Sequence, residues 1–131
     1  MTLGILVVDD EPDVAELFKQ RFRAELRNGQ VAFHFATSAE QALESLASGL
    51  TPETFLVLSD INMPGMSGLD LLQRLRAQSP DVPVIMVTAY GDIENRRRAL
   101  DIGATDLVTK PVDFVELKKM VNSIIAQTQA A

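Results

Sequence analysis

The sequence contains no cysteine and no tryptophan, and its aromatic residues are six phenylalanines and one tyrosine. Without cysteine there is no disulfide framework, no thiol catalysis and no Cys-ligated zinc site. Because aromatics are scarce, we expect a core built mainly from Val, Ile, Leu and Ala. Basic residues are also in the minority, since 12 Lys and Arg face 18 Asp and Glu and give a formal net charge of −6. This balance argues against nucleic-acid binding, which needs a basic face.

Long hydrophobic runs are missing as well. The apolar stretches are far shorter than the roughly 20 residues of a membrane span, and the N-terminal residues carry no basic segment of the signal-peptide type. We therefore expect a cytoplasmic protein without membrane contact. The 131 residues suit one domain, and a hydrophobic content of 47% is enough to bury a core. We assign residues 1–131 to this domain, with a core at about 3–126 and a frayed end or linker start at 127–131.

Short apolar runs alternate with helical patterns along the chain. Runs of four residues that are rich in β-branched side chains, at 5–8, 55–58 and 84–87, are typical of strands buried on both faces. The alternating segment 31–36 predicts a half-exposed edge strand, and residues 107–108 are a shorter fifth candidate. The chain is therefore expected to contribute five strands.

Helical periodicity and capping residues predict five helices, one after each strand. They are expected from Pro12 through Leu26, from a capping box at Ser38 and Gln41, from Ser67 to before Pro80, over residues 93–102, and from Asp113 with Glu116. A β-α unit repeated five times predicts an α/β fold, with a doubly wound parallel sheet between two layers of helices. We expect the flavodoxin-like strand order 2-1-3-4-5, which makes strands one and three neighbours.

Polar residues follow the predicted strands. Asp9 and Asp10 follow the first strand and Asp60 follows the third, while Thr88 closes the fourth and Lys110 follows the fifth. The carboxyl ends of parallel strands meet at one edge of the sheet, where ligands bind. Neighbouring strands one and three would bring the three carboxylates together, and such a cluster needs a compensating cation. Mg²⁺, which prefers carboxylates, waters and phosphate oxygens, suits this site.

A carboxylate beside Mg²⁺, a lysine and a hydroxyl can accept a phosphoryl group as an aspartyl phosphate. Taken singly, each residue also has an ordinary structural role. An Asp after a strand is often a helix N-cap, Thr88 could serve packing or a turn, and Lys110 could lie on a solvated loop. The joint placement of all these residue types at one edge of the sheet favours the phosphoryl site.

Four segments resemble the receiver domains of response regulators in two-component signalling, with their chemotaxis-regulator-like fold. They are ILVVDDEP at residues 5–12, SDINMPGMSGL at 59–69, VTAY at 87–90 and GATDLVTKP at 103–111. The resemblance covers essentially the whole chain. It implies a phosphoprotein that takes a phosphoryl group from a sensor histidine kinase or a phosphotransfer protein and controls an output partner or domain. Such a receiver catalyses its own phosphorylation and dephosphorylation and is not an enzyme in the usual sense.

The resemblance also implies roles for individual residues. Asp60 would be the phosphoacceptor and a Mg²⁺ ligand, together with Asp9 and Asp10, of which Asp10 would bind directly and Asp9 partly through water. The backbone carbonyl of Asn62 would complete the protein's share of the metal shell. Lys110 would pair with the phosphoryl group, and its bond to the following proline would be cis.

A second set of residues is implied in switching. Thr88 would turn to hydrogen-bond the phosphoryl oxygen, and Ala89 leaves space for it. The side chains of Asn62 and Tyr90 would flank the path of the hydrolytic water and tune the lifetime of the phosphorylated state. The chain departs from the family at Leu107, where many receivers carry Tyr or Phe that couples to the hydroxyl. Tyr90 is either a substitute reporter or a surface tyrosine.

The partner surfaces and two other functions are left open by the sequence. The run Arg96-Arg97-Arg98 is either a partner surface or a solvated helix face, and a homodimer through the last two helices is possible. A pseudo-receiver would signal without phosphate, although it would be free to lose part of the polar set. A small Mg²⁺-dependent phosphohydrolase is the enzyme alternative, but the first strand lacks an Asp-x-Asp-x-Thr signature and no cap insertion encloses a substrate.

Overall fold

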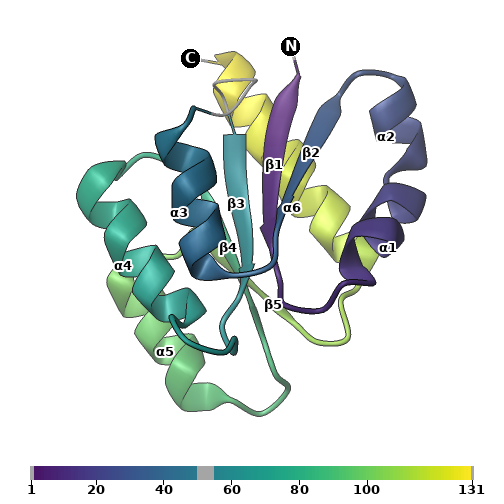
Figure 1. Cartoon of the computed structure of the whole chain (residues 1–131). Coiled ribbons are helices and arrows are strands. Elements are labelled where there is room, and N and C mark those ends of the chain that lie inside the picture. Colours follow the sequence, from purple (N-terminus) through teal and green to yellow (C-terminus); the bar gives the residue numbers. More distant parts are fainter. Residues whose placement is uncertain (1, 50–54, 131) are drawn as a thin grey trace.

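The computed structural model describes residues 2–49 and 55–130, and these residues form one parallel five-stranded sheet between two layers of helices (Figure 1). The strand order is β2-β1-β3-β4-β5, and every neighbouring pair is parallel, as the sequence predicts. The strands are β1 (Leu3–Val8), β2 (Val31–Ala36), β3 (Phe55–Asp60), β4 (Val84–Thr88) and β5 (Asp106–Thr109). The helices are α1 (Val14–Arg21), α2 (Arg23–Arg27), α3 (Ala39–Ala47), α4 (Gly68–Gln78), α5 (Ile93–Ile102) and α6 (Phe114–Ala130).

The helices divide between the two faces of the sheet. Helices α1, α2 and α6 cover one face, and α3, α4 and α5 cover the other (Figure 1). The three inner strands are buried along almost their whole length, whereas β2 is buried only at its two ends, as expected for a half-exposed edge strand. No helix in the described part of the chain has the length and apolarity needed to cross a bilayer.

The number of helices differs from the five expected, because the first predicted helix is divided at Phe22. This residue has φ −104° and ψ 23°, which ends α1 and begins α2. Its N–H still donates to Phe18 O at 2.9 Å, and its carbonyl accepts from Leu26 N at 2.9 Å. The Phe22 side chain is buried in the core. The apolar spacing therefore continues across the break, and for this reason the sequence pattern does not reveal it.

Element boundaries also differ slightly from the prediction. Strand β3 continues to Asp60, so this aspartate is the last residue of the strand and not the first residue after it. Helix α6 continues to Ala130, so residues 127–130 extend the last helix. The helix caps at Ser67 and Asp113 form as predicted. At Ser38 the cap forms too, but the Gln41 side chain accepts from Thr37 N at 2.6 Å instead of closing the box on Ser38.

The two sides of the sheet have different cores. The α3–α5 side is aliphatic, as expected from the composition. On the α1/α6 side, most buried residues are also Val, Ile and Leu, as expected, but five of the six phenylalanines join them in one cluster of stacked and edge-to-face rings. The cluster comprises Phe18, Phe22, Phe33, Phe35 and Phe114. Phenylalanine is rare in the sequence but concentrated in this one region.

The aromatic cluster leads to a stability prediction. The Phe22→Ala substitution removes a ring that is 1% exposed and contacts three neighbouring rings, so it leaves a cavity. We expect it to lower the free energy of unfolding by about 3–5 kcal/mol, measured by urea denaturation. Tyr90→Ala is the matched control, because its ring is 89% exposed, and a change within about 0.5 kcal/mol is expected. Equal losses in the two variants would contradict the packing described.

Candidate functional site

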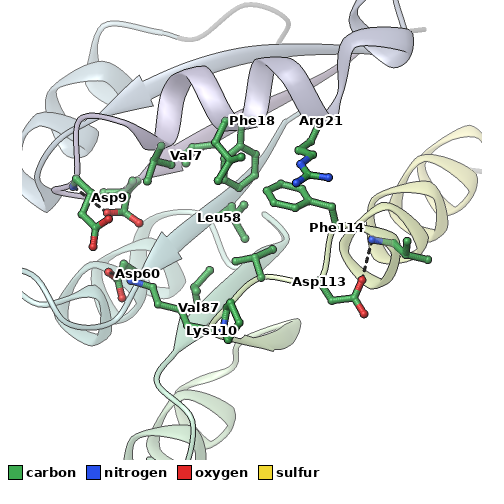
Figure 2. Close-up of a pocket in the computed structure, with 17 residues that line it drawn as sticks. Val7, Asp9, Phe18, Arg21, Leu58, Asp60, Val87, Lys110, Asp113 and Phe114 are labelled. Carbon is green, nitrogen blue, oxygen red and sulfur yellow. Dashed lines mark hydrogen bonds and ion pairs between the residues drawn. The ribbon is translucent and has the colours of Figure 1, made fainter.

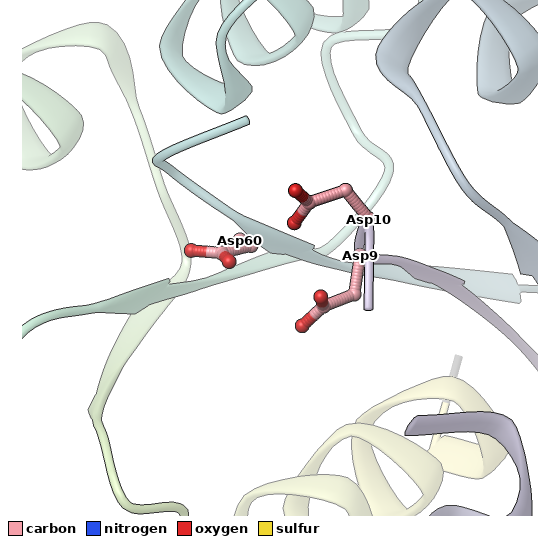
Figure 3. Close-up of side chains that lie close together, drawn as sticks. All are labelled: Asp9, Asp10 and Asp60. Carbon is pink, nitrogen blue, oxygen red and sulfur yellow. The ribbon is translucent and has the colours of Figure 1, made fainter. Parts of the chain in front are cut away.

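The acidic residues meet at the carboxyl edge of the sheet. Val7 and Leu58 are paired in the neighbouring strands β1 and β3. Asp9 lies two residues beyond Val7, and Asp60 lies two residues beyond Leu58. Side chains alternate along a strand, so both carboxylates lie on the α1/α6 side of the sheet. Asp10 adds a third carboxylate, and oxygen atoms of the three groups lie within 4.8 Å of one another (Figure 3). The structure thus forms the acidic cluster that the sequence predicts.

Asp60 is the most buried of the three acids and the best provided with donors. Its side chain is 5% exposed, and Lys110 Nζ donates to its Oδ2 at 2.8 Å. The backbone N–H of Asn62 donates to Oδ1 at 3.3 Å. Lys110 is itself held by its backbone N–H, which donates to Thr88 O at 2.8 Å, and its bond to Pro111 is cis, as the resemblance implies. One buried carboxylate is therefore held beside an ammonium group whose side chain is 37% exposed.

Charge is not balanced around this pair. Burial raises the pKa of Asp9, and the neighbouring Asp60 raises it further, against the opposing effects of its hydrogen bond from Glu11 N at 2.9 Å and of Lys110. Asp10 is exposed. Burial alone would lower the pKa of Lys110, but the hydrogen bond and charge of Asp60 outweigh it and raise that pKa. The site thus keeps its ammonium group charged and has negative charge left over for a cation.

Thr88 carries an unused hydroxyl at the same carboxyl edge of the sheet. The residue is fully buried at the end of β4, and its Oγ1 is without a hydrogen-bond partner among the described residues. A buried hydroxyl in this state costs free energy unless another ligand satisfies it. Thr88 pairs with Thr109 in the sheet, directly before Lys110. Thr88 and Lys110 therefore lie near the same edge of the sheet.

The remaining predicted residues surround the site without contacting the ion pair through their side chains. Ala89 and Asn62 are exposed, and Tyr90 is 89% exposed, which makes it a surface tyrosine in this structure. Leu107 is half-buried and packs against the aliphatic core on the α3–α5 side. The position that carries an aromatic ring in many receivers therefore belongs here to the hydrophobic core.

Two residues support the site although the sequence did not single them out. A side chain on Gly68 would overlap the backbone of Asp60 and Ile61, and the Gly68 N–H donates to Ile61 O at 2.9 Å. This glycine lets the start of α4 pack against the end of β3. Glu40 Oε1 accepts from Met66 N at 3.2 Å and ties α3 to the loop after Asp60. The Glu40 contact joins residues 26 positions apart, so no local sequence pattern signals it.

Comparison with known proteins identifies the family. The family model of the response regulator receiver domain matches residues 5–122. The response regulator protein PilR of Pseudomonas aeruginosa is 40% identical over 120 residues, which are 88% of this chain and 24% of that protein. An uncharacterized 14.6 kDa protein of Leptolyngbya boryana is 40% identical over 121 residues, or 91% of this chain and 87% of that protein. The chain belongs to the response regulator receiver domains.

Solved structures agree with this assignment. A response regulator receiver domain protein from Clostridium thermocellum superposes with a TM-score of 0.85 at 26% identity, covering 98% of both chains. The receiver domain of NtrX from Brucella abortus gives a TM-score of 0.79 at 31% identity, covering 93% of this chain and 98% of that one. Several curated relatives are longer than this chain. The chain spans 50% of the regulatory protein TcrX of Mycobacterium tuberculosis and 47% of the response regulator RppA of Synechocystis.

Membership of the family defines the chain as a signalling domain and not a classical enzyme. Receiver domains typically bind Mg²⁺ at an acidic pocket, and the cluster of Asp9, Asp10 and Asp60 fits that ion. The donor set consists of carboxylate oxygens, as Mg²⁺ prefers, and the residual negative charge calls for a cation. The chemistry of the described residues therefore agrees with the metal that the family uses.

The raised pKa of Asp9 predicts a pH-dependent stability difference. Without metal, the negative charge of Asp9 lowers the stability of the folded protein. This loss of stability develops as the pH rises from the ordinary pKa of 3.8 through the raised pKa that Asp9 has in the folded protein. We expect Asp9→Asn, unfolded with urea in EDTA, to be more stable than the parent protein at pH 7. The two proteins should converge in stability as the pH falls below 3.8, where both side chains are neutral. A parent protein more stable than the variant at pH 7 would contradict the charge imbalance.

The unpartnered hydroxyl of Thr88 predicts that removing it stabilises the fold. Thr88→Val keeps the shape of the side chain, so we expect the free energy of unfolding without phosphoryl donor to rise by about 1 kcal/mol. Thr105→Val is the matched control, because Thr105 Oγ1 accepts from Val84 N at 3.0 Å. Its removal leaves a backbone donor unpaired and should cost about 1–2 kcal/mol. Loss of stability in both variants would show that Thr88 Oγ1 has a partner.

Proposed function

We propose that the chain is a phosphorylatable receiver that takes a phosphoryl group onto Asp60 from a histidine kinase or a phosphotransfer protein. The observation that carries the proposal is the Lys110–Asp60 ion pair of 2.8 Å, with two further carboxylates next to it and an unpartnered hydroxyl, that of Thr88, at the same edge of the sheet. An ion pair with only a structural role would not need the two further carboxylates, because their negative charge raises the free energy of the folded state. A site for phosphoryl transfer needs all of these groups.

The ion pair suggests how the transfer proceeds. An oxygen of the Asp60 carboxylate attacks the phosphorus of a phosphohistidine, the P–N bond breaks, and its electron pair returns to the imidazole of the donor. Lys110 then pairs with an oxygen of the transferred group, a short move from Asp60 Oδ2. Mg²⁺, held by the three aspartates and the backbone carbonyl of Asn62, would neutralise charge on the phosphoryl oxygens. Water ends the modification by attacking the same phosphorus, along a path that the side chains of Asn62 and Tyr90 border. The bond from phosphorus to the Asp60 oxygen then breaks, and inorganic phosphate and the free carboxylate are released.

Thr88 and the helix after it are proposed to carry the signal. The Thr88 hydroxyl turns to the phosphoryl oxygen, and the exposed Ala89 gives its loop room to follow. Helix α5 buries a single residue, Ala99, and is therefore held weakly. Arg96 Nη1 donates to Thr109 Oγ1 at 3.1 Å, which links this helix to β5. A shift of α5 would alter the surface presented to an output partner or domain.

The surfaces that contact partner proteins are proposed in less detail. Arg97 and Arg98 are exposed, while the side chain of Arg96 is half-buried by its bond to Thr109, so the basic run divides into one internal contact and two surface charges. A homodimer through α5 and α6, the last two helices, and a cytoplasmic location are both predictions of the sequence. Leu107 implies that the switch works without the aromatic relay of many receivers.

The proposed function is tested by mass spectrometry of the intact protein. The protein is incubated with Mg²⁺ and acetyl phosphate, and we expect one added phosphoryl group in the parent protein and none in Asp60→Asn. Asp81→Asn, a matched change at an exposed aspartate before β4, should be modified like the parent. Omitting Mg²⁺ should abolish the adduct in the parent protein and in Asp81→Asn.

Other outcomes identify the alternatives. If the parent protein takes up no phosphoryl group and binds no beryllofluoride, the chain is a pseudo-receiver. If it hydrolyses a phosphomonoester over many turnovers, it is a phosphohydrolase. Modification of Asp60→Asn to the same extent as the parent would place the phosphoacceptor elsewhere.

A further inference from the structure

Two different surfaces border the Asp60 carboxylate. On the α1/α6 side a groove of about 780 Å³ opens beside it, with Arg21 at the far end (Figure 2). On the α3–α5 side the boundary is the loop of residues 61–67, which joins β3 to α4. This loop contains Asn62, whose backbone carbonyl is proposed above as a Mg²⁺ ligand. The position of that carbonyl therefore depends on how the loop is held.

The two ends of the loop are fixed by the secondary structure next to them. Ile61 is buried, and its N–H donates to Val87 O at 3.0 Å. At the other end, Ser67 forms a capping box with Asp70 in the first turn of α4. Residues 62–66 lie between these ends and outside any helix or strand. Individual contacts must therefore hold the middle of the loop.

Two hydrogen bonds reach residues 62–66 within the described part of the chain. The Asn62 N–H donates to Asp60 Oδ1 at 3.3 Å, and the Met66 N–H donates to Glu40 Oε1 at 3.2 Å. The acceptor of the first bond is the proposed phosphoacceptor, so this bond belongs to the site itself. The acceptor of the second bond belongs to α3. The Glu40 bond therefore ties the loop to a separate element of the fold.

The Glu40 carboxylate also lies against the turn that shapes the loop. Gly65 has φ +75°, a left-handed conformation that residues with a side chain rarely adopt. A Cβ atom at this glycine would lie 3.8 Å from both oxygens of the Glu40 carboxylate. The carboxylate thus borders the turn at Gly65 and accepts from the N–H of the next residue, Met66. One side chain therefore meets two consecutive residues of the loop.

Helix α3 gives this side chain a rigid base. Ala39 and Ala42, on either side of Glu40, are fully buried and pack in the aliphatic core. The Ser38 hydroxyl caps the helix by accepting from Gln41 N at 3.0 Å. Because the first turn of α3 is fixed in this way, a group bound by Glu40 is held at a constant position relative to the sheet.

Glu40 also has an ordinary structural interpretation. An acid in the first turn of a helix is stabilised by the partial positive charge of the helix N-terminus, without any contact to a loop. That role depends on the charge of the side chain, whereas the bond from Met66 N needs only an acceptor oxygen. Glutamine keeps an acceptor oxygen and lacks the charge. One substitution can therefore separate the two roles.

We propose that Glu40 is a positioning residue for the metal site, which holds the loop through Met66 N and so keeps the Asn62 carbonyl in place for Mg²⁺. The inference rests on the proposed function, because it assigns that carbonyl to the ion. Glu40 acts through the loop and is not itself a ligand. A loop that is already held loses less conformational freedom when one of its carbonyls binds an ion, so the ion binds more tightly.

The first measurement is the Mg²⁺ affinity of the unphosphorylated protein, followed by the carbonyl carbon resonance of Asn62 as Mg²⁺ is added. We expect Glu40→Ala to raise the dissociation constant about fivefold, as the loss of one hydrogen bond that orders the loop would give. Glu40→Gln retains the acceptor, so its dissociation constant should stay within about twofold of the parent value. Equal affinities of Glu40→Ala and the parent protein overturn the proposal.

Glu44→Ala is the matched control for the charge of α3. Glu44 is an exposed acid one turn further along the same helix, and its removal should leave the Mg²⁺ affinity within about twofold of the parent value. Equal losses of affinity in Glu40→Ala and Glu40→Gln also overturn the proposal, because the charge of Glu40 and not its hydrogen bond would then set the affinity.

Hydrogen exchange tests the contact itself. The Met66 N–H should exchange with solvent faster in Glu40→Ala than in the parent protein, because its acceptor is gone. In Glu40→Gln the exchange should remain close to that of the parent. Equal exchange in the parent protein and Glu40→Ala would show that the bond does not hold the loop, and the proposal fails.

Phosphorylation separates metal positioning from a general loss of stability. With acetyl phosphate in excess, the Mg²⁺ concentration that gives the half-maximal rate should rise about fivefold in Glu40→Ala, while the rate at saturating Mg²⁺ stays within about twofold of the parent rate. A lower saturating rate with an unchanged Mg²⁺ dependence overturns the proposal. Urea denaturation checks that each variant is folded before the rates are compared.

The outcomes distinguish this inference from the proposed function. If the parent protein is modified at Asp60 and Glu40→Ala binds Mg²⁺ as the parent does, the positioning role is rejected and the receiver function stands. If the folded parent protein neither binds Mg²⁺ nor takes up a phosphoryl group, the proposed function is rejected, and the role of Glu40 is rejected with it.

Discussion

Three carboxylates meet one ammonium group at the carboxyl edge of the sheet, and the other features of the site follow from this imbalance. Asp60 is buried with Lys110, whereas Asp9 and Asp10 add negative charge that the described contacts do not neutralise. The backbone N–H groups of Glu11 and Asn62 donate hydrogen bonds to Asp9 and Asp60, which reduces the electrostatic repulsion between the carboxylates but does not remove it. The fold therefore maintains a local excess of negative charge that a divalent cation would relieve. A site with less excess negative charge would bind such a cation less strongly.

The two layers of helices serve this edge in different ways. On the α3–α5 side, an aliphatic core and the close packing of Gly68 fix the position of the Asp60 backbone. On the α1/α6 side, an aromatic cluster surrounds a groove that leads away from the same carboxylate. One side thus positions the backbone of Asp60, and the other forms the groove beside its carboxylate. Helix α5 belongs to the first side, buries a single residue, Ala99, and is tied to β5 by the bond from Arg96 to Thr109.

Much of the fold was predictable because the alternation of strands and helices is directly visible in residue type. The parallel sheet between two helix layers follows from that alternation, and the flavodoxin-like strand order then brings Asp9, Asp10 and Asp60 together. Features that depend on distant contacts were not predictable. The division at Phe22 leaves the apolar spacing intact, so periodicity gives no sign of it. The hydrogen bond from Met66 to Glu40 joins two segments whose proximity arises only in the folded chain.

The distribution of chromophores gives the molecule a built-in optical probe. The chain has one tyrosine and no tryptophan, and Tyr90 lies two residues after Thr88 in the loop that leads into α5. Its ring is 89% exposed, so its surroundings are set by water and by whatever covers the loop. Tyrosine fluorescence of the unmodified chain therefore originates at this one place, without background from the core. Solvent quenching of that emission reports whether a partner or a second copy covers the loop, with no label attached to the protein.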